Sequence, residues 1–352
     1  MRERAGGRPV IAVVKAEAYG HGAVAVARRL AREGVDRFAV ALCEEGVALR
    51  RGGIRGEILV LEGVDPSRVA ECFGYGLTPA VHSVEGARAL ARAAAGSRAP
   101  LPVHVKLDTG MRRLGAPRES VPALAAALRA SRELAVAGVF TQLSSGESES
   151  SEPTARELAL LREGLAALER SGIAPGTVHA ANSGALLAHA DALLDAVRPG
   201  LALYGVLPAE GLANPGLRPA LALETRVLAV RDVPAGATAG YGGAFVAGRP
   251  TRLATLPIGY HDGLRRSVSG RFSVRVRGGW APVVGVVSMD LTLVDATDSG
   301  AEPGDRVIVL GRDGDVDVTA WDLARAASTV PWEVLSTLSP RVPRVYSERG
   351  AA

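Results

Sequence analysis

The feature that most constrains the fold of this chain is a regular alternation of short β-branched runs with alanine-rich segments over its first 205 residues. The segments between the runs, such as AVAVARRLAREG and PALAAALRASREL, have helical periodicity. Strands that alternate with helices pair in parallel through right-handed crossovers. The alternation therefore predicts an α/β fold, a (β/α)8 barrel, with a doubly wound open sheet as the structural alternative. The eight runs are IAVVK (11–15), RFAVAL (37–42), EILVLE (57–62), TPAVHS (78–83), VHVKLD (103–108), LAVAGVFTQ (134–142), TVHAANS (177–183) and VRPGLALYG (197–205).

The pattern changes after residue 219. Strand-like segments such as TRLATLPI, FSVRVRGG and DRVIVLG follow one another there, separated by Gly, Pro and Asp turns. This is typical of a mostly antiparallel β domain. A short helix, TAWDLARAAS, is expected near the end of the chain. We therefore expect two domains, a barrel over residues 1–219 and a β domain over residues 220–352.

Composition excludes several classes of protein. The charge is +4, and the 39 arginines are scattered among acidic residues, so no nucleic-acid-binding stripe is expected. No stretch has the roughly 18 consecutive apolar residues of a membrane span. Cys43 and Cys72 have no metal-type spacing, nor do the six histidines, and no metal site is expected. The expected location is the cytoplasm.

Lysine is almost absent from this chain. The two lysines are Lys15, which ends the first predicted strand, and Lys106, which lies near the end of the fifth. Barrel enzymes assemble their active sites at the carboxyl ends of the strands. An amine at this rim can lose its proton and form a Schiff base, whereas a guanidinium cannot. The two lysines therefore indicate either a carbohydrate aldolase or a pyridoxal phosphate enzyme.

Three glycine-rich turns follow the predicted strands on the same rim. They are YGHG after Lys15, ANSG at 181–184 and RPGLALYG at 198–205. Such turns offer backbone N–H groups to a phosphate without further cationic side chains. A single turn of this kind is weak evidence, but three on one rim favour a phosphorylated cofactor.

With these motifs the sequence resembles the alanine racemase family, the fold type III pyridoxal phosphate enzymes. The resemblance runs through VVKAEAYGHG, HVKLDTGMRRLG, HAANSGA, RPGLALYG, AGYGGAF, LPIGYHDG, VVSMDLTLVD and RVPRVY, in the family's order. It implies an isomerase that interconverts L-alanine and D-alanine with pyridoxal 5'-phosphate. It also implies a homodimer with shared active sites, and a cytoplasmic supply of D-alanine for peptidoglycan.

The resemblance also implies roles for individual residues. Lys15 would hold the cofactor and act as one catalytic base, and Tyr241 of the second subunit would be the other base. Arg113, Met289 and Tyr260 would meet the substrate. Lys106 would be carbamylated and orient Arg113, unless it remains an ordinary ammonium group paired with Asp108 or another acid. The cofactor itself would be held by Lys15, Tyr19, His179, Ser183, Arg198, Gly200, Leu201 and Tyr346.

Three positions depart from the family pattern, one of which is Trp332, where the family has a tyrosine. Gln142 stands where the family has a histidine under the cofactor ring, and Glu17 replaces an asparagine and would place an anion close to the cofactor. These changes leave open a racemase of serine or another small amino acid. A non-catalytic pyridoxal phosphate carrier and a decarboxylase of the same fold are further alternatives. The second domain with Tyr241 argues against the carrier, and the lack of a cysteine motif argues against the decarboxylase.

Overall fold

The computed structural model describes residues 1–148 and 150–347. The chain divides into two compact units, Met1–Leu217 and a second unit that begins at Arg218. This division falls two residues before the end of the predicted barrel domain.

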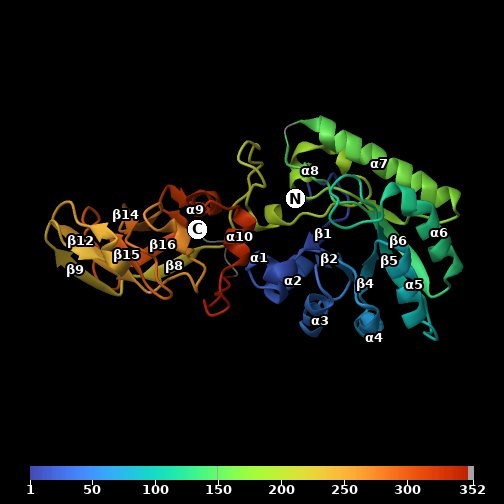
Figure 1. Cartoon of the computed structure of the whole chain (residues 1–352), viewed down its shortest axis with the longest axis horizontal. Coiled ribbons are helices and arrows are strands. Elements are labelled where there is room, and N and C mark those ends of the chain that lie inside the picture. The colour runs from blue at the N-terminus through green and yellow to red at the C-terminus, as the bar shows by residue number, and fades with distance from the viewer. Residues whose placement is uncertain (149, 348–352) are drawn as a thin grey trace. The chain divides into compact units, whose positions relative to one another are not determined.

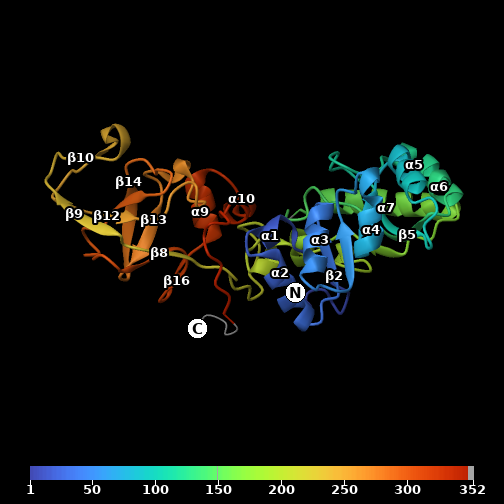
Figure 2. The same cartoon turned by 90° about the horizontal axis from the view of Figure 1, so that it is seen from below.

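The first unit is a parallel barrel (Figures 1 and 2). Its seven strands are hydrogen-bonded in sequence order, with helices between them along the chain. The strand residues are almost all buried, since parallel strands are covered on both faces. The strands are β1 (Ile11–Val13), β2 (Arg37–Val40), β3 (Glu57–Val60), β4 (Thr78–Val81), β5 (Leu101–Lys106), β6 (Leu134–Phe140) and β7 (Thr177–His179). The helices are α1 (Lys15–Tyr19), α2 (Ala23–Arg32), α3 (Cys43–Arg51), α4 (Val69–Tyr75), α5 (Val84–Ala93), α6 (Val121–Ala130), α7 (Ser151–Arg170) and α8 (Ser183–Ala188).

The eighth strand position is occupied by two residues only. Ala196 bridges to His179 of β7, and Val197 bridges to Val10 just before β1, so the ring of strands closes between them. The predicted eighth strand, 197–205, is wrong beyond this point. Pro199 has no N–H for a strand ladder, and the chain turns into a short 3₁₀ helix, η4 (Leu201–Tyr204). The predicted barrel fold is nevertheless confirmed.

The second unit is built on an antiparallel sheet in the order β17-β16-β13-β14-β15-β12-β9, with β8 paired to β16. Its core is mostly valine, leucine and alanine from these strands and from α9 (Ala320–Ala327). The predicted antiparallel domain and its helix are confirmed. The strands are β8 (Leu223–Arg226), β9 (Ala229–Val233), β10 (Thr238–Ala239), β11 (Phe245–Val246), β12 (Thr251–Leu256), β13 (Ser273–Val276), β14 (Gly279–Val284), β15 (Thr292–Asp295), β16 (Arg306–Asp313) and β17 (Val316–Val318); a last helix is α10 (Pro331–Ser336).

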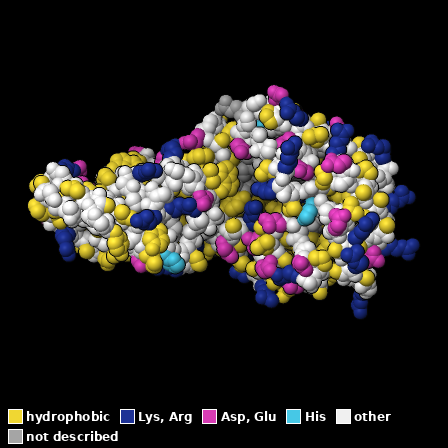
Figure 3. Space-filling view, in the orientation of Figure 1, with side chains coloured by type: hydrophobic (Ala, Val, Ile, Leu, Met, Phe, Trp, Pro, Cys, Tyr) yellow, Lys and Arg dark blue, Asp and Glu magenta, His cyan; other side chains and the backbone are white. Residues whose placement is uncertain are grey.

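Charge and hydropathy characterise the surface and the described helices of the two units. On the face drawn in Figure 3, the cationic and anionic side chains of the barrel unit are interspersed. Across the described residues, no helix has both the length and the apolar character needed to cross a bilayer. Nor do residues 1–148 and 150–347 contain a group of three or more His, Cys, Asp or Glu side chains arranged to hold a metal ion.

Candidate active site

Cationic side chains gather at the carboxyl ends of the barrel strands. Lys15 is the first residue of α1, two positions after the last residue of β1. Lys106 is the last residue of β5, and Arg198 follows the bridge that closes the ring. The Lys106 Nζ and the Arg198 Cζ both lie over the ring of Phe140, 5.5 and 5.2 Å from its centroid. The structure therefore brings both lysines and the arginine to one rim, as the sequence predicts.

The ammonium group of Lys106 is destabilised by this environment. Burial lowers its pKa to about 8, with further contributions from Arg113, Arg198 and Lys15. Asp108 does not supply the pairing considered for it, because its Oδ1 accepts the backbone N–H groups of Gly110 and Arg112 at 3.0 Å each. About one tenth of the Lys106 amine is therefore neutral at pH 7, far more than for an ordinary lysine, and this fraction can react with an electrophile.

Arg198 is buried, with 3% of its surface exposed, and acceptors surround it. Its Nη2 donates to the carbonyls of Thr141 at 2.6 Å and Ala180 at 3.2 Å, and its Nη1 donates to the carbonyl and to Nδ1 of His179 at 2.9 and 2.6 Å. Burial lowers the pKa of Arg198 to about 9, so the guanidinium still keeps its proton at neutral pH. The guanidinium of Arg198 is thus a hydrogen-bond donor that the surrounding carbonyls hold in a fixed orientation at the rim.

A chain of hydrogen bonds continues from Arg198 through the barrel interior. Because Nδ1 of His179 accepts from Arg198, its Nε2 carries the proton and donates to Nδ1 of His104 at 2.9 Å. The Nε2 of His104 in turn lies 3.0 Å from Oε1 of Glu57, at the amino end of β3. Burial and the charge of Arg198 hold the pKa of His179 well below its ordinary value, so this ring is neutral. The sequence signal for His104 is its position two residues before Lys106, on the same face of β5.

A second cluster surrounds the turn between Ala196 and η4. The Oγ of Ser183 accepts the N–H groups of Gly200 at 2.8 Å and of Ala202 at 3.1 Å. A Cβ atom at Gly200 would lie 2.5 Å from the hydroxyl of Tyr19, so only glycine fits there. Burial raises the pKa of Tyr19 to about 12, which keeps its phenol protonated. Hydroxyls and backbone N–H groups around a glycine are a donor set that suits a phosphate ester.

The segment after Lys15 has an unusual backbone. Ala16, Glu17, Ala18 and Tyr19 all have φ between 50 and 54°, which makes α1 a left-handed turn. Non-glycine residues in this region cost about 1–2 kcal/mol each. Glu17, expected to place an anion close to the cofactor, instead directs its Oε2 to the N–H of Ala23 at the start of α2, at 3.1 Å. The carboxylate of Glu17 thus caps a helix.

The remaining predicted residues of the barrel unit lie at the same rim but make fewer contacts. Arg113 is exposed and lies close enough to Lys106 to lower its pKa. Leu201 is buried at the start of η4. Gln142 is half-buried, and its Nε2 donates to the carbonyl of Leu143 at 3.3 Å.

In the second unit, the predicted residues are exposed aromatic and apolar side chains. Tyr241 is 71% exposed and begins a short 3₁₀ turn, η5 (Tyr241–Gly243), between β10 and β11. The loops that carry Tyr260 and Met289 are joined by backbone bonds from the Tyr260 N–H to Ser288 at 3.0 Å and from the His261 N–H to Met289 at 3.1 Å. Tyr346 is also exposed. The structure therefore joins the loops of two predicted substrate residues and presents all four side chains at the surface.

The barrel, the rim lysine, the fixed arginine donor and the phosphate-type cradle together define a class of barrel enzymes that bind a phosphorylated, Schiff-base-forming cofactor. The sequence matches the family descriptions "Alanine racemase, N-terminal domain" over residues 1–208 and "Alanine racemase, C-terminal domain" over residues 220–346. The chain belongs to the alanine racemase family, whose members are isomerases, and the predicted resemblance is confirmed.

Individual relatives agree with this assignment. An alanine racemase of Sorangium cellulosum is 41% identical over 345 residues, covering 96% of this chain and 91% of the relative. The crystal structure of an alanine racemase from a D-cycloserine-producing Streptomyces lavendulae matches with a TM-score of 0.93 and 35% identity, covering 99% of this chain and 93% of that one. An alanine racemase of Bartonella henselae with covalently bound pyridoxal phosphate matches with a TM-score of 0.89 and 30% identity over 98% and 94% of the two chains.

Proposed function

We propose that this chain interconverts L-alanine and D-alanine with pyridoxal 5'-phosphate by a two-base mechanism, and that it supplies D-alanine for peptidoglycan in the cytoplasm. The observation that carries the proposal is the rim of the barrel unit. At this rim lie the buried guanidinium of Arg198, Lys15 and the turn at Gly200 that Tyr19 and Ser183 surround. The chain that carries them belongs to the alanine racemase family.

The residues at the rim fit the cofactor. Lys15 would bind it covalently, and Arg198 would donate to its ring nitrogen, with His179 holding the guanidinium in place. Since Arg198 keeps its proton, the ring nitrogen would stay unprotonated. The phosphate would take the hydroxyls of Tyr19, Ser183 and Tyr346 and the backbone N–H groups of Gly200 and Leu201. When bound, the cofactor withdraws electrons from the substrate α-carbon and makes its proton acidic.

Racemisation needs a proton to leave one face of the α-carbon and another to arrive on the opposite face. The Lys15 amine would act on one face, and the phenol of Tyr241 of the partner subunit on the other. Tyr241 is 71% exposed, and this exposure suits a residue that completes the site of a second copy. Tyr241 therefore supports a homodimer with shared active sites.

Other exposed apolar side chains of the second unit support the same dimer. Val246, Leu291, Met289 and Tyr260 are all more than 40% exposed. Tyr260, Met289 and Leu291 lie on loops that are hydrogen-bonded to each other, and exposed apolar side chains that gather in one place mark interaction sites. A second copy of the chain is the partner that would cover them and would bring Met289 to the substrate carboxylate.

The substrate carboxylate would be held by Arg113 and by the backbone N–H of Met289. The lowered pKa of Lys106 supports its carbamylation, because carbon dioxide adds only to a neutral amine. The resulting anion would orient the guanidinium of Arg113. Lys106 would then be a positioning group and not a base.

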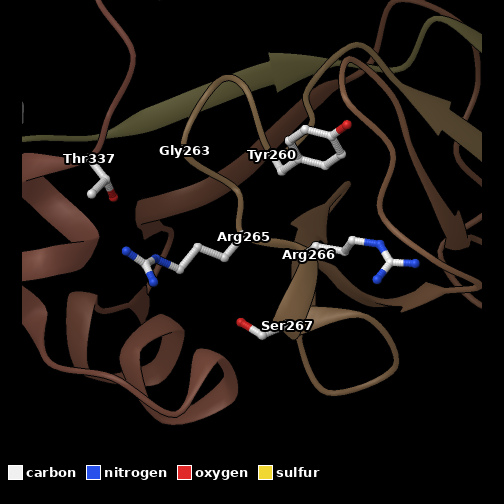
Figure 4. Close-up of a pocket in the computed structure, with 6 residues that line it drawn as sticks. All are labelled: Tyr260, Gly263, Arg265, Arg266, Ser267 and Thr337. Carbon is white, nitrogen blue, oxygen red and sulfur yellow. The ribbon is translucent and has the colours of Figure 1, made fainter.

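Tyr260 also lines a pocket of about 460 Å³ within the second unit (Figure 4). The other lining residues are Gly263, Arg265, Arg266, Ser267 and Thr337. Arg265 is paired with Glu333 at 2.6 Å, so Arg266 supplies the less neutralised cation of the pocket.

The proposal is tested by a chiral assay of the purified protein with pyridoxal 5'-phosphate and a panel of small L-amino acids that includes serine. Alanine is expected to give the highest kcat/KM. Borohydride reduction followed by peptide mapping should place the cofactor on Lys15, and Lys15→Ala should not be labelled. A preference for serine would redirect the substrate assignment, and labelling of any other residue would contradict the assignment of the cofactor lysine.

The two bases are tested separately. Tyr241→Phe should lower the rate of α-proton exchange by about 10²- to 10⁴-fold, because a general base is lost. Mixed dimers of Lys15→Ala and Tyr241→Phe should recover part of the activity, since one of the two sites then has both bases. Wild-type exchange in Tyr241→Phe would refute the two-base scheme, and a mixture as inactive as its parents would refute shared sites.

A further inference from the structure

The left-handed turn after Lys15 has no local reason to form. Its sequence, Ala16-Glu17-Ala18-Tyr19, contains no glycine, and alanine and glutamate favour a right-handed helix. A run of non-glycine residues in this conformation persists only where surrounding contacts over-determine it. The contacts that hold the turn therefore decide where Lys15 and Tyr19 lie.

The contact nearest Lys15 comes from Glu45, in the first turn of α3. Its Oε1 accepts the N–H of Ala16, in the peptide that directly follows Lys15, at 2.6 Å. Its Oε2 accepts the N–H groups of Ala41 at 2.7 Å and Leu42 at 3.0 Å. One carboxylate thus ties the Lys15–Ala16 peptide to the end of β2 and the start of α3.

The other contacts act further along the turn. His21 Nδ1 lies 3.0 Å from the carbonyl of Ala18 and 2.9 Å from that of Tyr19, and it donates its proton between them. Glu17 reaches forward to Ala23. Among these side chains, Glu45 is the one bonded to the peptide of Lys15 itself.

We propose that Glu45 is a positioning residue for the reaction: its carboxylate holds the strained turn so that Lys15 and Tyr19 face the cofactor site together. This inference rests on the proposed function of Lys15 as the cofactor-binding lysine. Charge-assisted bonds from a carboxylate to backbone N–H groups are among the stronger hydrogen bonds in proteins. Glutamine at this position would turn an NH₂ donor toward backbone N–H groups, whichever way the amide lies.

The first experiment uses the protein without cofactor. Hydrogen exchange of peptides covering residues 14–22 should be slow in the wild type and faster by about tenfold or more in Glu45→Gln, because an amide has one acceptor oxygen and cannot accept from both Ala16 and the Ala41–Leu42 segment. Glu44→Gln is the matched control, since Glu44 lies in the same first turn of α3 and pairs with Arg68. Exchange as slow in Glu45→Gln as in Glu44→Gln would overturn the proposal.

The second experiment titrates pyridoxal 5'-phosphate. Glu45→Gln should raise the Kd of the cofactor by about tenfold and lower kcat. The KM for alanine should change little, because the Glu45 carboxylate bonds to backbone N–H groups and not to Arg113. An unchanged Kd with faster exchange would overturn the positioning role. A wild-type chain that bound no cofactor would instead refute the proposed function, while the exchange result would still stand.

Ala16→Gly separates positioning from simple capping of α3. Glycine adopts positive φ without strain, so the turn no longer needs to be held as firmly. The double variant Ala16→Gly/Glu45→Gln should therefore regain cofactor affinity relative to Glu45→Gln, and should fold even where the single variant does not. If glycine gave no recovery, Glu45 would act only by stabilising α3, and the proposal would fall.

Discussion

Gly200→Ala tests the cradle that the barrel rim forms around Tyr19. An added Cβ would lie 2.5 Å from the Tyr19 hydroxyl and 3.0 and 3.1 Å from two of its ring carbons. The tyrosine cannot simply rotate away, because it is 9% exposed and packs edge-on against Tyr204 with ring centroids 5.1 Å apart. Gly200 has a negative φ of −118°, and the effect of the substitution is expected from the steric clash.

The size of the effect follows from this overlap. Overpacking of a buried site costs about 1–3 kcal/mol, and we expect the free energy of unfolding of the protein without cofactor to fall by that amount. Cofactor affinity should fall as well, since Tyr19 must move from the phosphate cradle. Tyr19→Phe in the Gly200→Ala background removes the shortest contact, and should recover stability but not cofactor affinity.

The assay is urea unfolding followed by far-ultraviolet circular dichroism. Tryptophan fluorescence would report the wrong unit, because Trp280, Trp321 and Trp332 all lie in the second unit. Gly74→Ala is the control, since it is exposed on α4 with no atom within 4 Å of the added Cβ. It should be neutral or stabilising by about 0.5–1 kcal/mol. If Gly200→Ala were as stable as Gly74→Ala and bound the cofactor as tightly, the proposed packing of Tyr19 against Gly200 would be refuted.

Two further predictions concern protonation. The pKa of His179 is well below its ordinary value, so as the pH falls below about 6.5 the unfolded chain takes up the proton first and stability is lost, with a slope of about 1.4 kcal/mol per pH unit from this group. His179→Gln should reduce this slope of stability against pH. The contribution of His82 should remain, because burial also lowers the pKa of His82. An unchanged slope would contradict a neutral His179. Lys106, with a pKa of about 8, should give a carbamate signal in ¹³C NMR with labelled bicarbonate. The signal should be absent from Lys106→Gln, and its persistence there would assign it elsewhere.

Much of the fold could be predicted from local pattern. The β-branched runs and the helical periodicity predict the strands and helices of the barrel, and the Gly, Pro and Asp turns predict the antiparallel strands of the second unit. The eighth strand could not be placed in this way, because VRPGLALYG has a strand-like composition. Only the closing bridges of Ala196 and Val197, and the missing N–H of Pro199, limit it to two residues.

The candidate site also has residues that the sequence singles out and a residue whose role only the structure shows. Lys15 and Lys106 stand out in the sequence because lysine is otherwise absent, and strand order alone places both on one rim. The role of Glu17 as a helix cap could not be predicted from its place in the lysine motif, because the left-handed turn that directs Glu17 toward Ala23 has no signal in the local sequence.

The sequence by itself determined the order of strands and helices, the rim that carries the lysines and the family, because these depend on side chains close together in the chain. Tertiary structure decided the left-handed turn after Lys15 and the hydrogen-bonded pair of His104 and His179. In both, the deciding partner lies far along the chain: Glu45 is 29 residues from Ala16, and the two histidines are 75 residues apart. Contacts at that separation form only when the barrel closes, so no local pattern records them.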